Sequence, residues 1–228
     1  MQTLPLQVAQ RIGAGIIDGS YPPGSRLREN ELSELFDVSR ATIREALRLV
    51  EKRGLVRIQP QRGAHVTQLS AQELEDLFEV RTSLLATGSR LAAERCTQEM
   101  AMTLQTLLER LRLHVDDVDA YVSTSAEMVH RLVHMSGNVV LANYIDDFAM
   151  RIGRYARMGL HSTARRKRSL ATWVQLVGAV IQRDGPAAAA HHARLAQENR
   201  CAALEVFKRH PHGGLVPADP PFRDPTES

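Results

Sequence analysis

The apolar positions of this 228-residue chain recur at helical spacing over most of its length. Residues 4–18 form the first such segment, with Val8, Ile12 and Ile16 on one side. No proline occurs in residues 61–185, and the apolar spacing in that stretch is helical nearly throughout. The pattern therefore predicts a mainly α protein.

Six helices are predicted after residue 69, separated by short polar or glycine-containing breaks. They cover residues 70 to 91, 100 to 111, 120 to 135, 141 to 160, 170 to 183 and 187 to 209. The first opens with Ser70 and Glu73 in the Ser-x-x-Glu form of a capping box. The basic stretch 165–168 falls between two predicted helices. We expect it to be an exposed loop or helix start rather than a second nucleic-acid site.

A different pattern occupies residues 29–66, where a helix-turn-helix is predicted. A short helix with Leu32, Leu35 and Phe36 ends at the turn Asp37-Val38, and a second helix begins at Ser39, whose hydroxyl suits an N-cap. The apolar stripe of the second helix is Ile43, Ala46, Leu47 and Val50. This stripe should pack on the domain core and leave the basic face free.

A small β-hairpin is predicted directly after the second helix. Gly54 stops that helix, residues 55–58 and 64–67 have the composition of short strands, and residues 59–63 turn between them. A hairpin in this position is a wing beside the helix-turn-helix.

The free face of the second helix has the chemistry of a nucleic-acid interface. A recognition helix enters the major groove N-terminus first, so the positions nearest the turn meet base edges. Here these positions are Ser39, Arg40, Ala41, Thr42 and Arg44. Arginine matches guanine O6 and N7 with its planar fork, whereas serine and threonine more often hold phosphates. The competing interpretation is that these arginines, with Arg48, form only a solvated helix face.

The stretch ELSELFDVSRATIREALRLVEKRGLV followed by QRGAHV resembles the winged-helix signature of the GntR family of bacterial transcription regulators. By that resemblance Arg40 and Arg44 would read bases, and Ser39 and Thr42 would contact the backbone or base edges. The residues that would flank the groove are Arg28, Asn30, Arg62 and Gly63. Family members often have a further small polar or proline residue where this chain has Ala41-Thr42, so its preferred half-site is expected to differ.

Charge is distributed unevenly between the two parts of the chain. Residues 1–68 hold 10 of the 29 basic and 7 of the 26 acidic residues, which leaves 19 of each for the remainder. All of the net charge of +3 therefore belongs to the first part, where it would attract a polyanionic partner. We expect a DNA-binding domain at 1–68, an effector-binding and dimerisation domain at 69–209, and a disordered, proline-rich tail at 210–228.

Cysteine usage and hydropathy point to a cytoplasmic protein. The two cysteines, Cys96 and Cys201, suit reduced thiols better than a disulfide scaffold. We recognise no secretory leader before the first helix, and no apolar run approaches the length of a membrane span. We therefore expect a soluble protein without a membrane partner.

The second part of the chain is similar to the ligand-binding domain of the FadR-like (FCD) branch of the same regulators. The similarity rests on short segments: Glu79-Val80-Arg81, Leu84, Arg90-Leu91-Ala92-Ala93, Ser136-Gly137-Asn138 and Arg183-Asp184. It implies a six- or seven-helix bundle that dimerises and responds to a small molecule.

Many members of that branch bind a divalent metal with one aspartate and three histidines. Counted from the Gly-Asn and Arg-Asp segments, those four positions fall here on Ser125, Val129, Trp173 and Leu195. Such side chains cannot hold a cation, so the resemblance implies a more apolar cavity without metal there. These four residues are candidate effector contacts, although Trp173 is as well explained as a core residue. Arg81, in an otherwise apolar helix, would pair with an acidic effector or form a structural salt bridge.

A shifted metal site is the alternative. Glu127, His130 and His134 fall at i, i+3 and i+7, so they can share a helix face, and His191-His192 lies on a later helix that could pack against it. In this alternative the metal ligands are His130, His134, His191 and His192. His-x-x-x-His by itself is a weak signal for zinc.

These patterns together favour a dimeric, ligand-responsive transcription regulator, a repressor rather than an activator. It would bind a palindromic double-stranded DNA operator as a homodimer and leave it when a small-molecule effector occupies the bundle. The alternatives are a metal-dependent ligand sensor of the same family, an architectural DNA binder without a ligand, and a helical-bundle metalloenzyme. The enzyme is disfavoured because the chain has no His-Glu-x-x-His, nucleophile elbow or phosphate loop.

Overall fold

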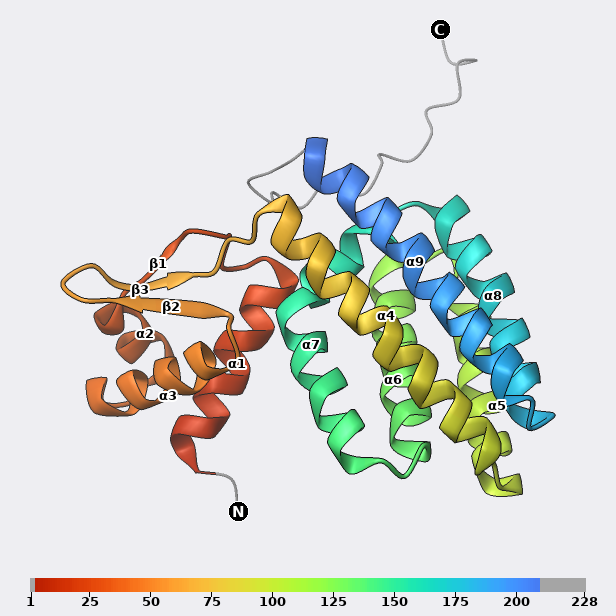
Figure 1. Cartoon of the computed structure of the whole chain (residues 1–228). Helices are drawn as coiled ribbons and strands as arrows, with labels where there is room; N and C mark the ends of the chain where they lie inside the picture. The colour runs from red at the N-terminus through yellow and green to blue at the C-terminus, as the bar shows by residue number, and fades with distance from the viewer. Residues whose placement is uncertain (1–2, 210–228) are drawn as a thin grey trace, which may run out of the picture.

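The structure, a computed structural model, describes residues 3–209 as a small N-terminal unit with a β-sheet beside a larger bundle of helices (Figure 1). In chain order the elements are α1 (Leu4–Asp18), β1 (Arg26–Leu27), α2 (Glu29–Phe36), α3 (Arg40–Lys52), β2 (Val56–Gln59), β3 (Gly63–Val66), α4 (Ala71–Glu94), α5 (Gln98–Leu113), α6 (Val118–Met135), α7 (Val139–Met158), α8 (Thr163–Ile181) and α9 (Gly185–Arg209). The tail expected to be disordered, 210–228, lies outside the described residues.

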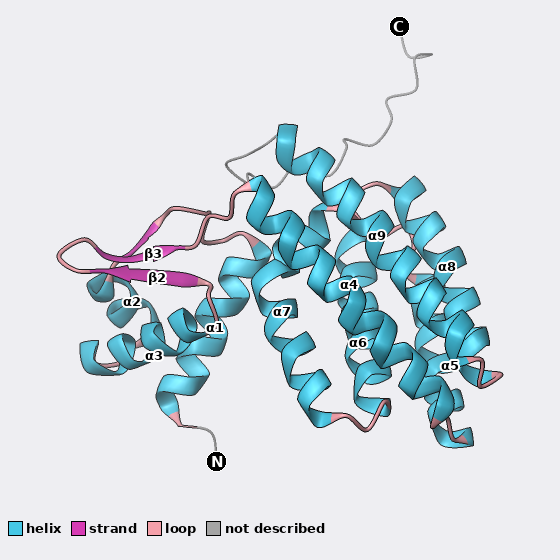
Figure 2. Ribbon diagram, in the orientation of Figure 1, coloured by secondary structure: helices cyan, strands magenta, loops and turns pink. Residues whose placement is uncertain are grey.

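The N-terminal unit is a winged helix-turn-helix with one strand more than predicted. Strands β2 and β3 form the expected antiparallel hairpin, with Ile58 opposite Ala64. Strand β1 adds to the other side of β3 and gives a three-stranded sheet of order β1-β3-β2 (Figure 2). A two-residue strand is too short to show an alternating pattern in sequence, which is why the pattern missed it.

Helix α3 buries the stripe that its spacing predicts. Ile43, Ala46, Leu47 and Val50 are each at most 2% exposed and belong to one core with residues of α1. The helix begins where expected, because the Ser39 hydroxyl accepts a hydrogen bond from the Thr42 backbone N–H at 3.2 Å. The buried stripe fixes which face of α3 looks outward.

Helix α4 joins the two units and then lies beside α9 along the bundle (Figure 1). Its N-terminus carries the predicted capping box: Ser70 Oγ accepts from the Glu73 N–H, and the Glu73 carboxylate accepts from the Ser70 N–H. Phe78, Tyr121 and Trp173 are fully buried large side chains of the bundle. Among the described residues, no helix is both long enough and apolar enough to cross a bilayer.

The basic stretch before Leu170 is a helix start, as one of its two predictions has it, but it is not wholly exposed. Helix α8 begins at Thr163, and Arg165 and Arg166 are each only 3% exposed, whereas Lys167 and Arg168 are exposed. Arg166 donates hydrogen bonds to the backbone carbonyls of Val115, Leu160 and His161. These backbone carbonyls thus accept the hydrogen bonds of a buried guanidinium. The run of charges in the sequence predicts instead that this side chain lies in solvent.

Helix α7 touches the winged helix as well as the bundle. A Cβ on Gly13 of α1 would lie 3.2 Å from Met150 Cε of α7, and a Cβ on Gly153 of α7 would lie 3.3 Å from Ile17 Cγ2 of α1. Glycines on both helices therefore allow α1 and α7 to pack closely. Through this contact between α1 and α7 the winged helix packs directly on the bundle.

Candidate nucleic-acid interface and ligand cavity

Helix α3 lies in the part of the N-terminal unit away from the bundle, near α2 and the wing (Figure 1). Ser39, Arg40, Ala41 and Arg44 are exposed, whereas Thr42 is half-buried, and its hydroxyl lies 2.9 Å from Ser39 Oγ. The Ser39 hydroxyl therefore already serves the helix N-terminus. Arg48 is also exposed, further along the helix.

Two of the candidate arginines hold carboxylates of α2. Arg44 Nε donates to Glu29 Oε2 at 2.7 Å, and Arg28 Nη1 donates to Glu31 Oε1 at 2.8 Å. Both pairs are solvent-exposed, so each is worth only about 0–1 kcal/mol. A phosphate or a guanine edge can displace such a partner at small cost. Asn30, between the two glutamates, is exposed.

The tip of the wing presents a cation on a tight turn. Arg62 is exposed, and its backbone N–H donates to the Gln59 carbonyl at 3.2 Å. Gly63 has φ of +84°, a conformation that residues with side chains rarely adopt. A Cβ at this position would lie 3.5 Å from Arg26 Nε. The turn therefore favours glycine at 63, next to the exposed Arg62.

The bundle contains a cavity of about 310 Å³ between α4, α6, α7, α8 and α9. All five candidate effector residues line it: Arg81, Ser125, Val129, Trp173 and Leu195. Its wall is predominantly apolar, and Ile17 of α1 also reaches it. The volume is near the lower end of the roughly 300–1,000 Å³ typical of small-molecule sites.

Several polar side-chain atoms around this cavity have no hydrogen-bond partner within the protein. They include Arg81 Nε, Trp173 Nε1, Asn199 Oδ1 and the three guanidinium nitrogens of Arg165. The Arg165 guanidinium has one ion pair, with Glu198 at 3.4 Å, but donates no hydrogen bond. Burial lowers the pKa of Arg81 to about 10, so it stays charged at neutral pH. The half-buried Arg81 and the buried Arg165 thus place two cations beside apolar walls, an arrangement that suits an anion.

His192 is a cavity residue that the sequence assigned to a different role. It is 1% exposed, its Nδ1 shares a hydrogen bond with Ser89 Oγ, and its ring lies 5.7 Å from that of Trp173. Burial, with a smaller contribution from the charge of Arg81, lowers the pKa of His192 to about 3. The imidazole is therefore neutral at pH 7, and the positive charge at the cavity belongs to the arginines.

The four family metal positions do not fit a cation in this chain. Ser125, Val129, Trp173 and Leu195 offer one hydroxyl, one N–H donor and two hydrocarbon side chains. The imidazole nearby, His192, already uses Nδ1 with Ser89. This part of the cavity is suited to an organic ligand.

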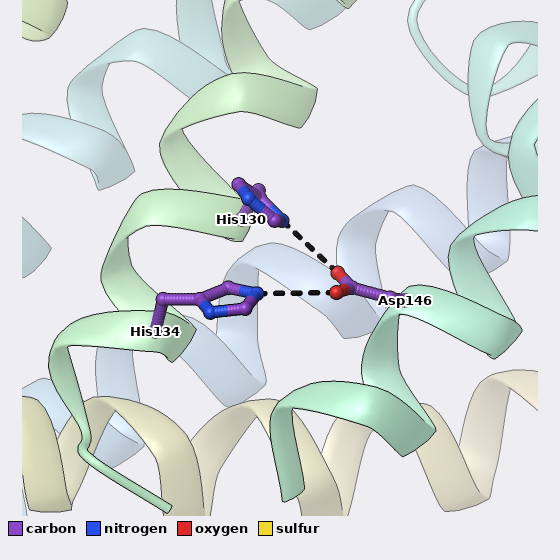
Figure 3. Close-up of side chains that lie close together, drawn as sticks. All are labelled: His130, His134 and Asp146. Carbon is purple, nitrogen blue, oxygen red and sulfur yellow. Dashed lines mark hydrogen bonds and ion pairs between the residues drawn. The ribbon is translucent and has the colours of Figure 1, made fainter. Parts of the chain in front are cut away.

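The alternative metal site of four histidines is not assembled as a group: the structure brings His130 and His134 together, but not His191 or His192. His130 and His134 of α6 face Asp146 of α7, with His130 Nδ1 3.1 Å from Oδ1 and His134 Nε2 3.1 Å from Oδ2 (Figure 3). His191 is not part of this group, and His192 points into the cavity because its side of α9 packs on α4 and α8. Glu127, on the same helix, instead pairs with Arg110 at 3.1 Å.

Asp146 and Arg165 are site residues that sequence reasoning missed. Asp146 lies on the helix after His134, and nothing in the local pattern says that the two helices bring these side chains together. Arg165 sits in a charge run that resembles a solvated surface. Conservation of an acidic residue at position 146 among homologous sequences would have indicated this contact, but conservation cannot be read from a single sequence.

A more open hollow of about 450 Å³ lies where the winged helix meets the bundle. Its walls include Arg57, Glu73 and Arg151, and Arg57 already pairs with Glu73 at 3.6 Å. The smaller cavity inside the bundle is the better ligand site, because it combines an apolar wall with polar atoms that lack partners.

Comparison with known proteins agrees with this geometry. Residues 4–66 match the family described as bacterial regulatory proteins, gntR family, and residues 76–198 match the FCD domain. YdhC of Bacillus subtilis, an uncharacterized HTH-type transcriptional regulator, is 30% identical over 62% of this chain and 64% of its own length. The HTH-type transcriptional repressor RspR of Escherichia coli is 25% identical over 82% of each chain.

A solved structure shows the same fold. McbR/YncC of E. coli has a TM-score of 0.79 at 23% identity, and the match covers 91% of this chain and 100% of that one. These relatives are named as HTH-type transcriptional regulators, one of them as a repressor.

Proposed function

The chain belongs to the GntR family of bacterial regulatory proteins and carries an FCD domain, and we propose that it acts as a homodimeric repressor. With these two domains it is a DNA-binding transcription regulator with a C-terminal effector-binding domain. The proposed operator is palindromic, because a twofold dimer presents two equivalent recognition helices to two half-sites. Binding to DNA places its action in the bacterial cytoplasm.

In the proposed DNA complex, the N-terminal part of α3 enters the major groove. Arg40 and Arg44 read base edges, and Ser39, Ala41 and Thr42 approach the backbone or bases. The flanking contacts come from the start of α2, the rest of α3 and the wing: Arg28, Asn30, Arg48, Arg62 and Gly63. The exposure of α3's basic face supports this arrangement.

The effector in this proposal is a small, mainly apolar anion such as a short- or medium-chain carboxylate. One observation carries it: Arg81 and Arg165 border an apolar cavity with guanidinium nitrogens that have no hydrogen-bond partner in the protein. A carboxylate supplies acceptors for these donors, while its hydrocarbon part contacts residues such as Val129 and Leu195.

Coupling between effector and DNA would pass through α7. This helix lines the cavity with Ile145, Ile152 and Gly153, and it packs on α1 through Gly153 and Met150. An effector that favours another position of α7 would reposition the winged helices of the dimer and weaken operator binding.

The DNA-binding part is tested by selecting preferred sequences from a random duplex pool with the full-length protein. We expect an inverted repeat, bound by two chains per duplex in native mass spectrometry. Arg44→Ala should remove about 1–3 kcal/mol of discrimination against a scrambled duplex in anisotropy titrations. Arg112→Ala, a bundle arginine, is the matched control. Equal discrimination by Arg44→Ala and the wild type would exclude base reading by Arg44.

The effector part is tested by a thermal-shift series of straight-chain monocarboxylates beside the primary amides of the same length. We expect carboxylates to raise the melting temperature, the amides not to, and Arg81→Met to abolish the response. Operator affinity should then fall in the presence of the best carboxylate. Equal shifts from acids and amides would exclude recognition of the anion, and tighter operator binding would exclude release by this ligand.

A further inference from the structure

A group of side chains with the donor atoms of metal ligands lies between α6 and α7 at the edge of the bundle cavity, and it includes none of the four family metal positions. His130 and His134 are one helical turn apart on α6, and Asp146 reaches toward both from α7 (Figure 3). The three donor groups lie within 4.8 Å of one another, and the two imidazole rings are 4.1 Å apart between centroids. We propose that His130, His134 and Asp146 bind a divalent transition-metal ion such as Zn²⁺.

The distances fit ligands of one ion. Imidazole nitrogens and carboxylate oxygens bind zinc at about 2.0–2.2 Å, so two ligands of a tetrahedral ion lie roughly 3.4 Å apart. Both nitrogen–oxygen distances here are 3.1 Å. An ion can therefore take the place of the two hydrogen bonds after small side-chain rotations.

The ligand chemistry selects the kind of ion. Two imidazoles and one carboxylate suit Zn²⁺, Co²⁺ and Ni²⁺, whereas Mg²⁺ and Ca²⁺ require mainly oxygen ligands. The three protein ligands leave at least one coordination position for water or another molecule. The side chains are 40–53% exposed, so an ion can enter from solvent without local unfolding.

A simple polar surface group is the competing explanation. An exposed histidine–aspartate ion pair contributes little to the stability of the fold, and such a pair consists of one histidine and one aspartate. Here two histidines at i and i+4 share one carboxylate across a helix pair, which is the arrangement that chelates an ion. The described residues contain no other such group of three or more histidine, cysteine, aspartate and glutamate side chains.

The position of the site gives the ion a role in the bundle. His130 and Asp146 also line the cavity, so the ion lies at the cavity edge and ties α6 to α7. The inference does not rest on the proposed repressor function, because metal binding can be measured without DNA or an organic effector.

The test is zinc titration of full-length protein that has been stripped with a chelator and then freed of it. We expect calorimetry and native mass spectrometry to give one Zn²⁺ per chain and no binding of Mg²⁺. His134→Gln and Asp146→Asn should each weaken zinc binding by more than about tenfold, because each removes one of three ligands. Asp147→Asn and His191→Gln should bind as the wild type does.

The neighbouring Asp147 is a matched control, since it lies on the same helix but outside the cluster. Circular dichroism establishes that the variants are folded. Absence of zinc binding by the wild type, or unchanged binding by Asp146→Asn, would overturn the proposal. Binding lost in His191→Gln would do the same. A thiolate charge-transfer band with Co²⁺ would assign the ion to the exposed Cys201 instead.

Discussion

His192 shows how burial decides the chemistry of one residue. In sequence it is half of a His-His pair with the appearance of a metal ligand, but in the structure it is a neutral cavity residue bonded to Ser89. The pair thus separates: His192 is buried, whereas the neighbouring His191 is only half-buried. A helix turns about 100° per residue, so adjacent side chains face different environments.

The pKa of His192 predicts acid sensitivity. The folded pKa of about 3 lies below the ordinary value of 6.5, so between these pH values the unfolded chain binds a proton that the folded chain does not. Stability should therefore be unaffected by this group above pH 6.5 and should fall by up to about 1.4 kcal/mol per pH unit as pH drops below it.

Urea denaturation across this pH range measures the slope. His192→Asn, whose amide can retain the bond to Ser89, should flatten the slope, and His161→Asn, at an exposed position, should leave it unchanged. An identical slope in His192→Asn and the wild type would show that the acid sensitivity comes from other groups.

We expect Arg62 to contact a DNA phosphate through its charge and not to contact a base. Arg62→Ala should weaken binding to specific and scrambled duplexes alike, because a phosphate contact carries no sequence information. The slope of log affinity against log salt should become shallower by about 0.9, the value for one phosphate contact. Anisotropy titrations at several salt concentrations measure this, with Arg112→Ala as the control. A change of sequence preference would place Arg62 against a base.

The packing of the bundle depends on how closely its helices approach. Gly159 ends α7 in a right-handed helical conformation, with no positive φ to explain it, and it lies against Asn199 of α9. A Cβ there would lie 2.7 Å from the Asn199 backbone oxygen. Glycine is required at this helix contact for space. Gly178, inside α8, has nothing within 4 Å of such a Cβ.

These two glycines form a matched pair for measurement. Gly159→Ala should destabilise the protein by about 1–3 kcal/mol, because the extra methyl group forces α7 and α9 apart. Gly178→Ala should stabilise it by roughly 0.5–1 kcal/mol, since alanine favours the helix and meets no neighbour. Urea denaturation gives both values. Destabilisation of similar size at both positions would contradict the argument from space.

The whole molecule is organised so that one helix serves both units. Helix α7 contributes to the cavity wall, to the histidine–aspartate cluster and to the contact with α1. Ile17 is the point where the winged helix itself reaches the cavity. An organic ligand and a metal ion would thus contact α7 directly, and DNA would act on it through the winged helix and α1. A shared element of this kind is the physical requirement for coupling between sites.

Ile17→Ala should uncouple the units while leaving each intact. A coupling of typical size changes affinity by about 5–150-fold, and we expect the variant to bring the effect of the best carboxylate on operator affinity close to onefold. Operator binding alone and carboxylate binding alone should persist. Leu4→Ala, at a 52% exposed position on the same helix, is the control. A full ligand effect in Ile17→Ala would mean that coupling bypasses this contact.

Much of the fold could be predicted because it depends on neighbours in sequence. The Ser39 cap, the capping box at Ser70 and the stripe of α3 each involve residues within a few positions of one another. Four of the candidate residues around the cavity were found by counting from family segments, and Arg81 was found as a charge in an otherwise apolar helix; all five line the cavity. Whether they bind an effector stays a prediction.

Only the tertiary structure decided which distant side chains meet. Asp146 reaches His130 and His134 from the next helix, Ser89 meets His192 across 103 positions, and Arg165 is buried. Helical spacing tells which residues share a face, but it does not tell which faces oppose each other or how close two helices come. These depend on packing over the whole bundle, where a small residue such as Gly159 sets the distance.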